Sequence, residues 1–364
     1  MNTDELINWL LESDEPVIRY KTYHELSNHT DESIENQLRK ELTSSEIVQK
    51  WLNKPEYDKD QIEEYLNEDD TDFIRRFWKI FHGSKATCAE NYLYKLKQLG
   101  LNSSFKEYDT LVKALVPALE KAKNYPIQIP LSFISKLLSG IGYYSLVKDN
   151  YDKRIHLMYD KLQETGFDIY LNPKEATFKF PSRWGHALVK PEYIVDDQLL
   201  FPNLYDLFVF SQLKLEKLEI WTKIEKIIEI IFDERYQRLK EGFGYGLYSN
   251  GKVYAIGYKI GLPGFFKFDS SQIDGTFLLK VFLMSYLPSA TKKPWFKQSI
   301  KFLEQFKTDR GTYNFPNKIL KESTSGYFIK GAYMGLSENR RSKNAKELES
   351  TFWMLAIKKW GLLR

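Results

Sequence analysis

The sequence is poor in residues that bind metals or form disulfides, because its 364 residues include only one cysteine, Cys88, and five histidines. A single cysteine excludes an intramolecular disulfide framework and any zinc site built from several thiolates. The histidines do not have the spacing of metal ligands, so we predict no metal centre and no cofactor. Seven glycines gather between residues 242 and 264, but they form no phosphate-binding or dinucleotide-binding fingerprint.

Long apolar runs are also missing from the sequence. No stretch approaches the roughly 18 apolar residues that a membrane-spanning helix needs. The first residues, Met-Asn-Thr-Asp-Glu, lack the basic flank and cleavage site of a secretory signal, so we expect a cytoplasmic protein without a membrane span. Positive charge is not gathered in one run, which disfavours nucleic-acid binding. No feature of the sequence points to a particular oligomeric state.

Aromatic residues, by contrast, are abundant, since 24 Tyr, 24 Phe and 8 Trp make up 15% of the chain. Apolar residues at 43% and charged residues at 28% indicate a globular protein rather than a disordered one. Aromatic side chains offer a large contact area with few rotatable bonds. Because their number exceeds what the packing of a helical core requires, we expect some of them to line a cavity or a binding surface.

Charge is distributed unevenly along the chain. Residues 1–72 contain seven basic and twenty acidic residues, a net charge of −13, so with +4 overall residues 73–364 carry +17. We therefore predict an acidic N-terminal helical extension, residues 1–72, and a body, residues 73–364. This asymmetry has three interpretations. The acidic part docks on the basic body, the basic body binds an anionic ligand, or the two parts are solvated surfaces that do not contact each other.

Apolar residues recur along most of the chain at the 3.6-residue spacing of amphipathic helices. We expect short helices within residues 4–52, and a weak helix or a surface connection over residues 53–72. Further helices are predicted over residues 73–82, 86–99, 106–124, 131–147, 151–165, 204–215, 218–239, 277–287, 297–306 and 348–360. The helix over 131–147 is apolar apart from Lys136 and small residues, so it should be buried on most sides.

Two regions favour short strands over helices. Residues 167–202 contain alternating apolar residues and several prolines. Asn250-Gly251 lies between the apolar segments 245–248 and 253–256, which predicts a β-hairpin with a two-residue turn.

An aromatic pattern repeats in the second half of the chain. Thr177-Phe-Lys-Phe-Pro181 and Thr312-Tyr-Asn-Phe-Pro316 lie 135 residues apart (312 − 177), and Tyr245-Gly-Leu-Tyr248 falls near the midpoint. The spacing indicates a unit of roughly 67 residues, in which an aromatic loop precedes an apolar helix. Repetition of a loop and a helix is typical of arrays in which no unit buries its own apolar face.

Other segments carry a resemblance to a known superfamily. Asp309-Arg-Gly-Thr-Tyr313 stands where a Gln-x-x-Asp-Gly-x-Trp repeat would stand. The opening Trp9–Tyr20 and the closing Glu349–Trp360 are similar to the ends of bacterial squalene-cyclase-like proteins without assigned activity. The chain thus resembles the squalene-cyclase and prenyltransferase-like α/α-toroid superfamily, which implies a double ring of helices around a central cavity.

Two functional motifs of that superfamily are missing from this sequence. Squalene-type cyclases protonate their substrate with an Asp-x-Asp-Asp motif, whereas Asp69-Asp70-Thr71-Asp72 has a different spacing, and we interpret it as a helix-capping cluster. Protein prenyltransferases hold zinc with Asp, Cys and His, and Cys88 lies far upstream of the repeats.

Acids at the starts of buried helices are the candidates for chemistry. Asp274 precedes an apolar run and Glu349 precedes Trp353, so both would supply acid chemistry or hydrogen bonds to a ligand. An acid in this position also serves as a helix cap, and that role stays open. Arg340 would bind an anionic group of a ligand. The predicted ligand-binding residues are Tyr258, Tyr333, Trp353 and Arg340.

We therefore predict an all-α protein, an α/α toroid with short β-hairpins in its loops. The alternative fold is an open solenoid of HEAT type. We expect it to bind a mostly apolar or ring-containing small molecule in a central aromatic cavity, with catalysis undecided. A non-enzymatic helical interaction scaffold and a carbohydrate-active enzyme of (α/α)-barrel type are the alternative functions.

Overall fold

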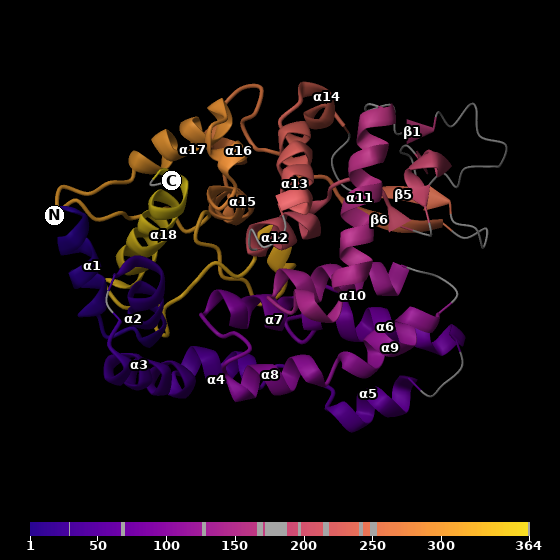
Figure 1. Cartoon of the computed structure of the whole chain (residues 1–364). Coiled ribbons are helices and arrows are strands. Elements are labelled where there is room, and N and C mark those ends of the chain that lie inside the picture. The colour runs from indigo at the N-terminus through magenta and orange to yellow at the C-terminus, as the bar shows by residue number, and fades with distance from the viewer. Residues whose placement is uncertain are drawn as a thin grey trace. The chain divides into compact units, whose positions relative to one another are not determined.

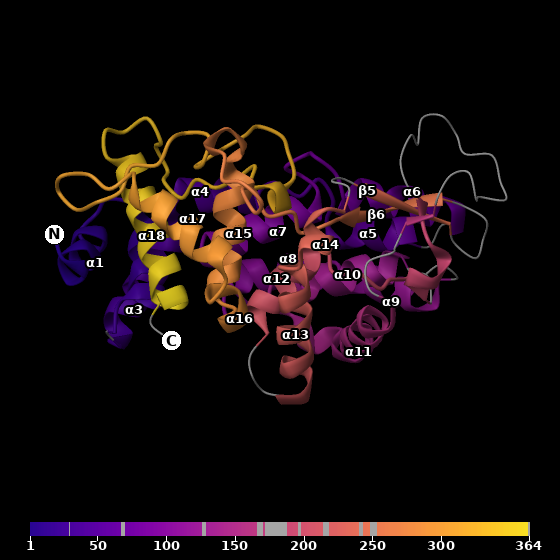
Figure 2. The ribbon, with the colours of Figure 1, turned by 90° about the horizontal axis from the view of Figure 1, so that it is seen from above.

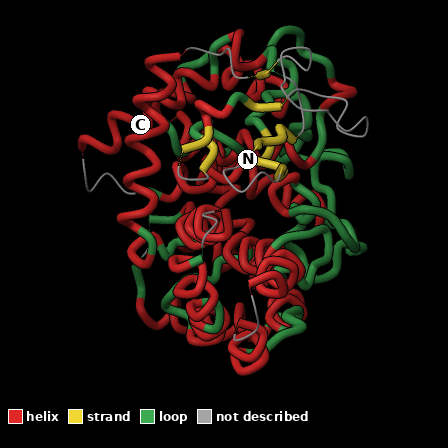
Figure 3. Tube along the Cα trace, turned by 90° about the vertical axis from the view of Figure 1, so that its right-hand side faces the viewer, coloured by secondary structure: helices red, strands yellow, loops and turns green. Residues whose placement is uncertain are grey.

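The computed structural model of the chain describes residues 1–28, 30–66, 70–125, 129–165, 170–171, 188–195, 198–213, 218–239, 243–247 and 253–362 (Figure 1). These residues are mostly helical, so the prediction of an all-α protein is confirmed (Figure 3). The chain forms two compact units. Unit 1 contains Met1–Ala118 and Pro263–Arg364, and unit 2 contains Leu119–Leu262.

Unit 1 is built from helices at both ends of the chain. Its N-terminal helices are α1 (Thr3–Leu11), α2 (Pro16–Lys21), the π-helix η1 (Thr22–Leu26), α3 (Glu32–Ser44), α4 (Glu46–Leu52), α5 (Lys59–Leu66), α6 (Asp70–Phe81), α7 (Ala89–Gln98) and α8 (Lys106–Lys113). Its C-terminal helices are the short η5 (Ser270–Gln272), α15 (Gly275–Ser285), α16 (Pro288–Thr291), α17 (Pro294–Glu304), the short η6 (Phe328–Lys330) and α18 (Ala345–Leu362).

Unit 2 adds helices and a small sheet, and α9 (Val116–Asn124) crosses from unit 1 into it. Its helices are α10 (Ile129–Gly140), η2 (Tyr144–Leu146), α11 (Lys148–Thr165), η4 (Pro191–Tyr193), α12 (Leu204–Gln212), α13 (Leu218–Ile231) and α14 (Glu234–Gln237). Its strands are β1 (Tyr170–Leu171), β2 (Leu188–Val189), β3 (Ile194–Val195), β4 (Gln198–Leu199), β5 (Phe243–Leu247) and β6 (Val253–Tyr258). Four of them form a sheet in the order β1-β2-β5-β6, and β3 pairs with β4.

Local sequence signals account for many of the helix ends. Asn2 and Glu5 form a capping box at the start of α1. The Asp31 carboxylate accepts hydrogen bonds from Ser33 N at 2.8 Å and Ile34 N at 3.1 Å, and so caps α3. Gly100, with φ of +111°, follows α7 and ends the helix in a left-handed conformation that suits glycine. These caps satisfy backbone groups that a helix terminus otherwise leaves unpaired.

Amphipathic and wholly buried helices alternate along the chain. Nearly every residue of α7, α10, α12 and α15 is buried, and so is every residue of α18 from Leu348 to Ile357. Amphipathic helices with one solvated face lie between them, as α6 does before α7 and α17 before α18. A helix that is buried on all sides must be covered by other elements, so α7, α15 and α18 form the core of unit 1, and α10 and α12 form that of unit 2.

The two ends of the chain pack against each other inside unit 1. Helix α18 contacts α1, α2 and η1, and Figure 2 shows the first and last helices side by side. The N-terminal amine of Met1 donates a hydrogen bond to Arg310 O at 2.8 Å. The acidic segment is therefore packed on the C-terminal part of unit 1. The boundary predicted after residue 72 stays a prediction, since compactness divides the chain after Ala118 and after Leu262.

The predicted helices and hairpin are largely present, with shifts in their bounds. The expected helix over 131–147 ends at Gly140, and the weak helix expected within 53–72 is α5. Strands β5 and β6 pair antiparallel as predicted, while their turn at 248–252 lies outside the described residues. The repeat segment at 177–181 also lies outside them. Within the described part of the chain, no helix has both the length and the apolar character needed to cross a membrane.

A close approach of two backbones joins α15 to η6. A Cβ placed on Gly331, whose φ is +63°, would lie 2.1 Å from the carbonyl carbon of Gly275. We expect Gly331→Ala to lower the free energy of unfolding by about 2–3 kcal/mol, because it combines a left-handed backbone with overpacking. Urea denaturation measures this loss, and Lys330→Ala on the exposed side of the same turn is the control. Equal losses in the two variants would contradict the steric explanation.

Candidate functional site

A pocket of about 540 Å³ lies in unit 1, between the α1–α2 turn and the loop before α18. Side chains from residues 9–15 and 338–348 line it. The carboxylates among them outnumber the basic side chains four to one. They are Glu12, Asp14, Glu15 and Glu338, with Lys343 as the basic residue. We call this hollow the acidic pocket. Its net negative charge favours a cationic ligand.

Short-range features position both walls of the acidic pocket. Pro16 occupies the first turn of α2, where its fixed backbone angle suits the start of a helix. The Ser13 hydroxyl donates to Leu10 O at 2.8 Å and closes the end of α1. In the opposite loop, Arg341 N donates to the Asn339 side chain at 3.1 Å, which is a turn typical of asparagine.

Glu15 joins the two walls and is the most buried acid of the pocket, with 8% of its surface exposed. Its Oε2 accepts a hydrogen bond from Glu338 N at 2.7 Å. Its Oε1 has no hydrogen-bond partner among the residues that the structure describes. Burial raises the pKa of Glu15 above its ordinary value, the Glu338 amide opposes this, and the charges of Glu338, Glu349 and Asp14 add to it. A cation in the pocket would offset both the burial of the Glu15 carboxylate and the repulsion from the neighbouring carboxylates.

An aromatic ring completes the lining of the acidic pocket. Trp9 is half-buried, and the guanidinium of Arg310 lies 5.6 Å from the centroid of its ring. Arg310 also approaches Glu347 at 3.8 Å. The ring of Trp9 therefore makes a cation–π contact with Arg310.

Beneath the acidic pocket, Glu349 organises the loop that precedes α18. The side chain of Glu349 is fully buried, and its Oε1 accepts hydrogen bonds from the backbone of Leu336 and Ser337, both at 2.8 Å. The guanidinium of Arg340 lies against the same carboxylate, with Nη2 at 3.0 Å from Oε2. Arg340 also donates to Leu320 O at 2.6 Å. Arg340 and Glu349, two of the predicted site residues, therefore pair with each other and hold the loop in place.

A buried lysine holds the same loop from the other side. The Lys95 ammonium donates to Tyr333 O at 2.9 Å and to Gly335 O, and it lies 3.4 Å from Glu322 Oε2. Glu322 in turn accepts a hydrogen bond from Gly335 N at 2.8 Å. Burial lowers the pKa of Lys95, while the charges of Glu322 and Glu349 raise it. Every buried charge of this cluster has a partner, as buried charges require.

Two predicted aromatic residues belong to this buried cluster. The indole Nε1 of Trp353 donates to Met334 O at 3.2 Å, and its ring packs edge-on against Phe282. The ring of Tyr333 lies edge-on to Trp51, with centroids 5.0 Å apart. Trp353 and Tyr333 are both fully buried. The structure therefore brings together four of the six predicted site residues, since Tyr333, Arg340, Glu349 and Trp353 all contact the loop before α18.

The other two predicted residues lie elsewhere. Asp274 is exposed and caps α15, where its carboxylate accepts hydrogen bonds from Thr276 N at 2.9 Å and Phe277 N at 3.3 Å. Tyr258 ends strand β6 of unit 2, and its side chain lies outside the described residues. The catalytic roles of Asp274 and Glu349 and the ligand-binding role of Tyr258 stay predictions.

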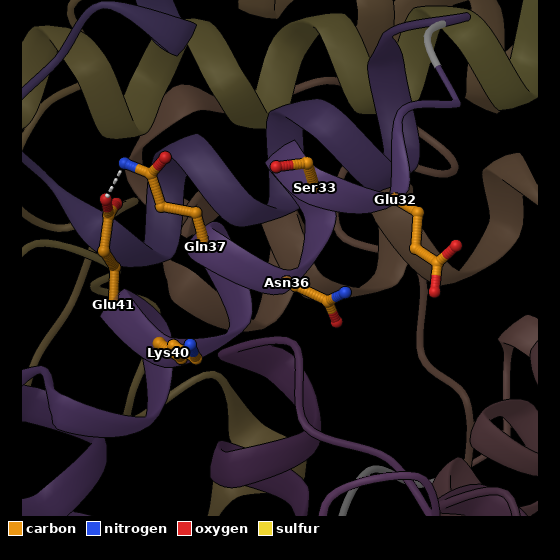
Figure 4. A pocket seen from close by; sticks show the side chains of 6 residues that line it. All are labelled: Glu32, Ser33, Asn36, Gln37, Lys40 and Glu41. Atoms are coloured by element: carbon orange, nitrogen blue, oxygen red, sulfur yellow. Dashed lines mark hydrogen bonds between the residues drawn. The ribbon is translucent and has the colours of Figure 1, made fainter.

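A second hollow, of about 620 Å³, lies on the outer side of α3. Figure 4 shows its lining side chains, all of which project from this one helix. Glu41 is occupied there, because it accepts a hydrogen bond from Gln37 at 2.8 Å and pairs with Arg19 at 2.7 Å. A hollow with one wall does not enclose a ligand, so it serves as a comparison for the acidic pocket.

The remaining reactive groups of unit 1 are held in structural contacts. Cys88 is buried, and burial raises the pKa of its thiol to about 11, so it is not a reactive thiolate at neutral pH. His82 Nδ1 lies 2.8 Å from the buried Glu90. Among the residues that the structure describes, no group of three or more His, Cys, Asp and Glu side chains is placed to hold a metal ion.

Comparisons with protein-family models, with curated proteins and with solved structures find no match for this chain.

The acidic pocket could not be predicted from the sequence because its two walls are far apart in the chain. Glu15 and Glu338, which share a hydrogen bond, are separated by 323 residues. Locally, Asp14 and Glu15 look like ordinary polar residues before a helix that starts at Pro16. The available signal is the acidic excess of residues 1–72, which shows where carboxylates are concentrated and not which of them face a pocket.

Proposed function

We propose that this protein binds a small organic cation that also carries a ring, and that the acidic pocket is the binding site. The observation that supports this most directly is Glu15, a carboxylate with 8% exposure and one oxygen without a protein partner in the described residues. This oxygen is not among the fully buried side-chain atoms that lack a partner, so it is accessible from the pocket. An ammonium group of a ligand would donate a hydrogen bond to it and neutralise the charge of the carboxylate.

The other groups of the pocket fit the same ligand. Glu12 and Asp14 are exposed at its rim, so they attract a cation from a distance. In dilute salt this attraction is only weakly screened. Trp9 offers a ring surface for stacking with an aromatic ligand. The pocket volume of about 540 Å³ suits a compound of metabolite size. The proposed ligand is thus the ring-containing small molecule expected from the sequence, with a positive charge added.

The α/α toroid is part of this proposal. The alternation of amphipathic and wholly buried helices supports it, because a double ring has half-solvated outer helices and enclosed inner ones. The contacts of α18 with α1, α2 and η1 support it as well, since a ring requires the two ends of the chain to meet. In such a ring, a central aromatic cavity of the kind expected from the resemblance would take the apolar part of a ligand.

Titration calorimetry with tryptamine tests the proposed function. Tryptamine carries an ammonium group and an indole, while indole-3-acetate carries the same ring with the opposite charge. We expect tryptamine to bind and indole-3-acetate to fail. Glu15→Gln should weaken tryptamine binding at least about tenfold, or roughly 1.4 kcal/mol, because it removes the buried charge and keeps the shape of the side chain.

Two comparisons make this test sharp. Glu32→Gln in the α3 hollow makes the same change in net charge and should leave the affinity for tryptamine unchanged. Because the pKa of Glu15 is raised, acidification should weaken tryptamine binding at a higher pH than an ordinary glutamate would. Equal binding of indole-3-acetate, or an unchanged affinity in Glu15→Gln, would refute the proposal. Native mass spectrometry of protein purified from its own host distinguishes a ligand-binding protein from a scaffold, because only the former retains a small molecule.

A further inference from the structure

A polar stripe runs along the buried helix α10 of unit 2. Each of Ser132, Ser135, Lys136 and Ser139 lies three or four residues from two of the others, so the four share one side of the helix. Every residue of α10 from Pro130 to Gly140 is buried. A polar stripe on a helix without a solvated face points to an interior site rather than to the protein surface.

The groups in this stripe lack the partners that buried polar groups normally have. Lys136 is 8% exposed and makes no hydrogen bond or ion pair among the described residues. The hydroxyls of Ser135 and Ser139 are buried and also lack partners there. Elsewhere in the same structure helical serines donate to the preceding turn, as Ser211 does to Phe208 O at 2.8 Å. One amine and two hydroxyls therefore have unused hydrogen-bonding capacity on the same side of α10.

The nearest opposite charge is already committed to another group. Asp206 of α12 is fully buried and pairs with Arg154 of α11, with Nη2 at 2.7 Å from Oδ2 and Nε at 3.0 Å from Oδ1. Tyr151 donates to the same carboxylate at 2.7 Å, and Asn203 N donates to it at 3.0 Å. Asp206 thus has its acceptor sites filled, so Lys136 faces a neutralised pair instead of a free counter-ion.

The protonation of Lys136 follows from this setting. Burial is the main cause that lowers the pKa of Lys136, to about 7, and the positive charge of Arg154 adds to it while Asp206 opposes it. Compared with an ordinary lysine near 10.4, the neutral fraction at pH 7 is roughly a thousandfold larger. A neutral amine has a free electron pair, which a protonated one lacks.

The contrast with Lys95 distinguishes Lys136 from a structural lysine. Lys95 is also buried, but it donates to Tyr333 O and Gly335 O and lies beside Glu322, as a structural lysine does. Lys136 has none of these acceptors in the described chain. A buried lysine that costs stability and makes no contact of its own is typical of lysines that act as nucleophiles.

We propose that Lys136 is a catalytic nucleophile that forms an imine with a small aldehyde or ketone. The Nζ electron pair attacks the carbonyl carbon, the carbon–oxygen π bond breaks, and a proton from the amine moves to the oxygen to give a carbinolamine. Loss of the second amine proton and of the hydroxyl as water then gives the carbon–nitrogen double bond. The hydroxyls of Ser135 and Ser139 donate hydrogen bonds to the oxygen as it becomes negative and leaves. No oxidant or reductant is consumed.

Reductive trapping with acetaldehyde and cyanoborohydride at pH 7 tests this proposal. We expect peptide mass spectrometry to show ethylation of Lys136 at least about tenfold faster than that of Lys123, an exposed lysine on α9. Lys95 should stay unmodified. Lys136→Met should lose this adduct alone, and it should fold because it removes an unpaired buried charge.

A pH profile of the trapping reaction separates a nucleophile from a merely accessible lysine. The rate at Lys136 should reach half of its plateau near pH 7, whereas the rate of an ordinary lysine amine still rises above pH 9. Ser135→Ala together with Ser139→Ala should slow the reaction at Lys136 and leave that at Lys123 unchanged. Ethylation of Lys136 no faster than that of Lys123, or only above pH 9, would overturn the proposal. The result is independent of the acidic pocket, which lies in unit 1.

Discussion

Glu349→Ala is expected to lower the free energy of unfolding by about 3 kcal/mol, because removing one partner of a buried pair strands the other. Glu349 is fully buried and accepts hydrogen bonds from Leu336 N, Ser337 N and Arg340. Alanine would leave two backbone amides and a guanidinium without their acceptor. Urea denaturation of the variant, followed by circular dichroism, measures the loss.

Glu347→Ala provides a matched control on the same helix. The Glu347 side chain is 16% exposed, lies 3.8 Å from Arg310 and accepts one hydrogen bond from Thr312, so its loss should cost about 1 kcal/mol, well below that of Glu349. Similar losses in the two variants would show that the burial of Glu349 does not decide its effect. A loss in Glu349→Ala that Arg340→Met largely restores would confirm that the stranded guanidinium carries the cost.

This expected result bears on the catalytic role predicted for Glu349. A variant that loosens the loop before α18 also disturbs the wall of the acidic pocket, since Glu338 lies in that loop. Reduced activity or binding in Glu349→Ala would therefore not identify Glu349 as a catalytic residue. Glu349→Gln, which keeps one acceptor oxygen, separates a lost charge from a lost loop when its stability is measured beside its binding.

The parts of the fold that were predictable from the sequence are those that local sequence signals determine. The apolar spacing places the helices, glycine ends α7 at Gly100, and Asp274 stands where a cap is needed. Tyr333, Arg340, Glu349 and Trp353 were predictable as a group because they lie within one short stretch of chain. All four contact the same loop, although the sequence could not show that Arg340 and Glu349 pair with each other.

Long-range packing accounts for what the sequence did not show. Lys95 reaches Tyr333 across 238 residues, and Glu15 reaches Glu338 across 323. No local pattern marks such partners, since each side chain sits in an ordinary amphipathic or polar segment. Lys136 is different, because a single lysine in an apolar helix is visible in the sequence. Whether such a lysine has a partner depends on α11 and α12, which only the fold brings to it.

Lys136→Met should stabilise the protein by about 4 kcal/mol at pH 7, a gain that few single substitutions give. The folded state holds this lysine at a pKa of about 7, and the unfolded chain holds it near 10.4. Between these values the unfolded state binds more protons, so the lysine destabilises the fold and this cost shrinks as the pH rises. Below pH 7 the full cost is present.

The advantage of Lys136→Met over the parent protein should therefore fade with rising pH, to under about 0.5 kcal/mol near pH 10.5, where both states hold a neutral amine. Urea denaturation of both proteins from pH 6 to pH 10.5 measures the difference, which cancels the titration of all other groups. Lys123→Met, at an exposed lysine, should show no such dependence. A stabilisation that is constant across this range would mean that Lys136 keeps an ordinary pKa. The gain would then come from burying a methionine, and the neutral amine on which imine formation depends would be absent at pH 7.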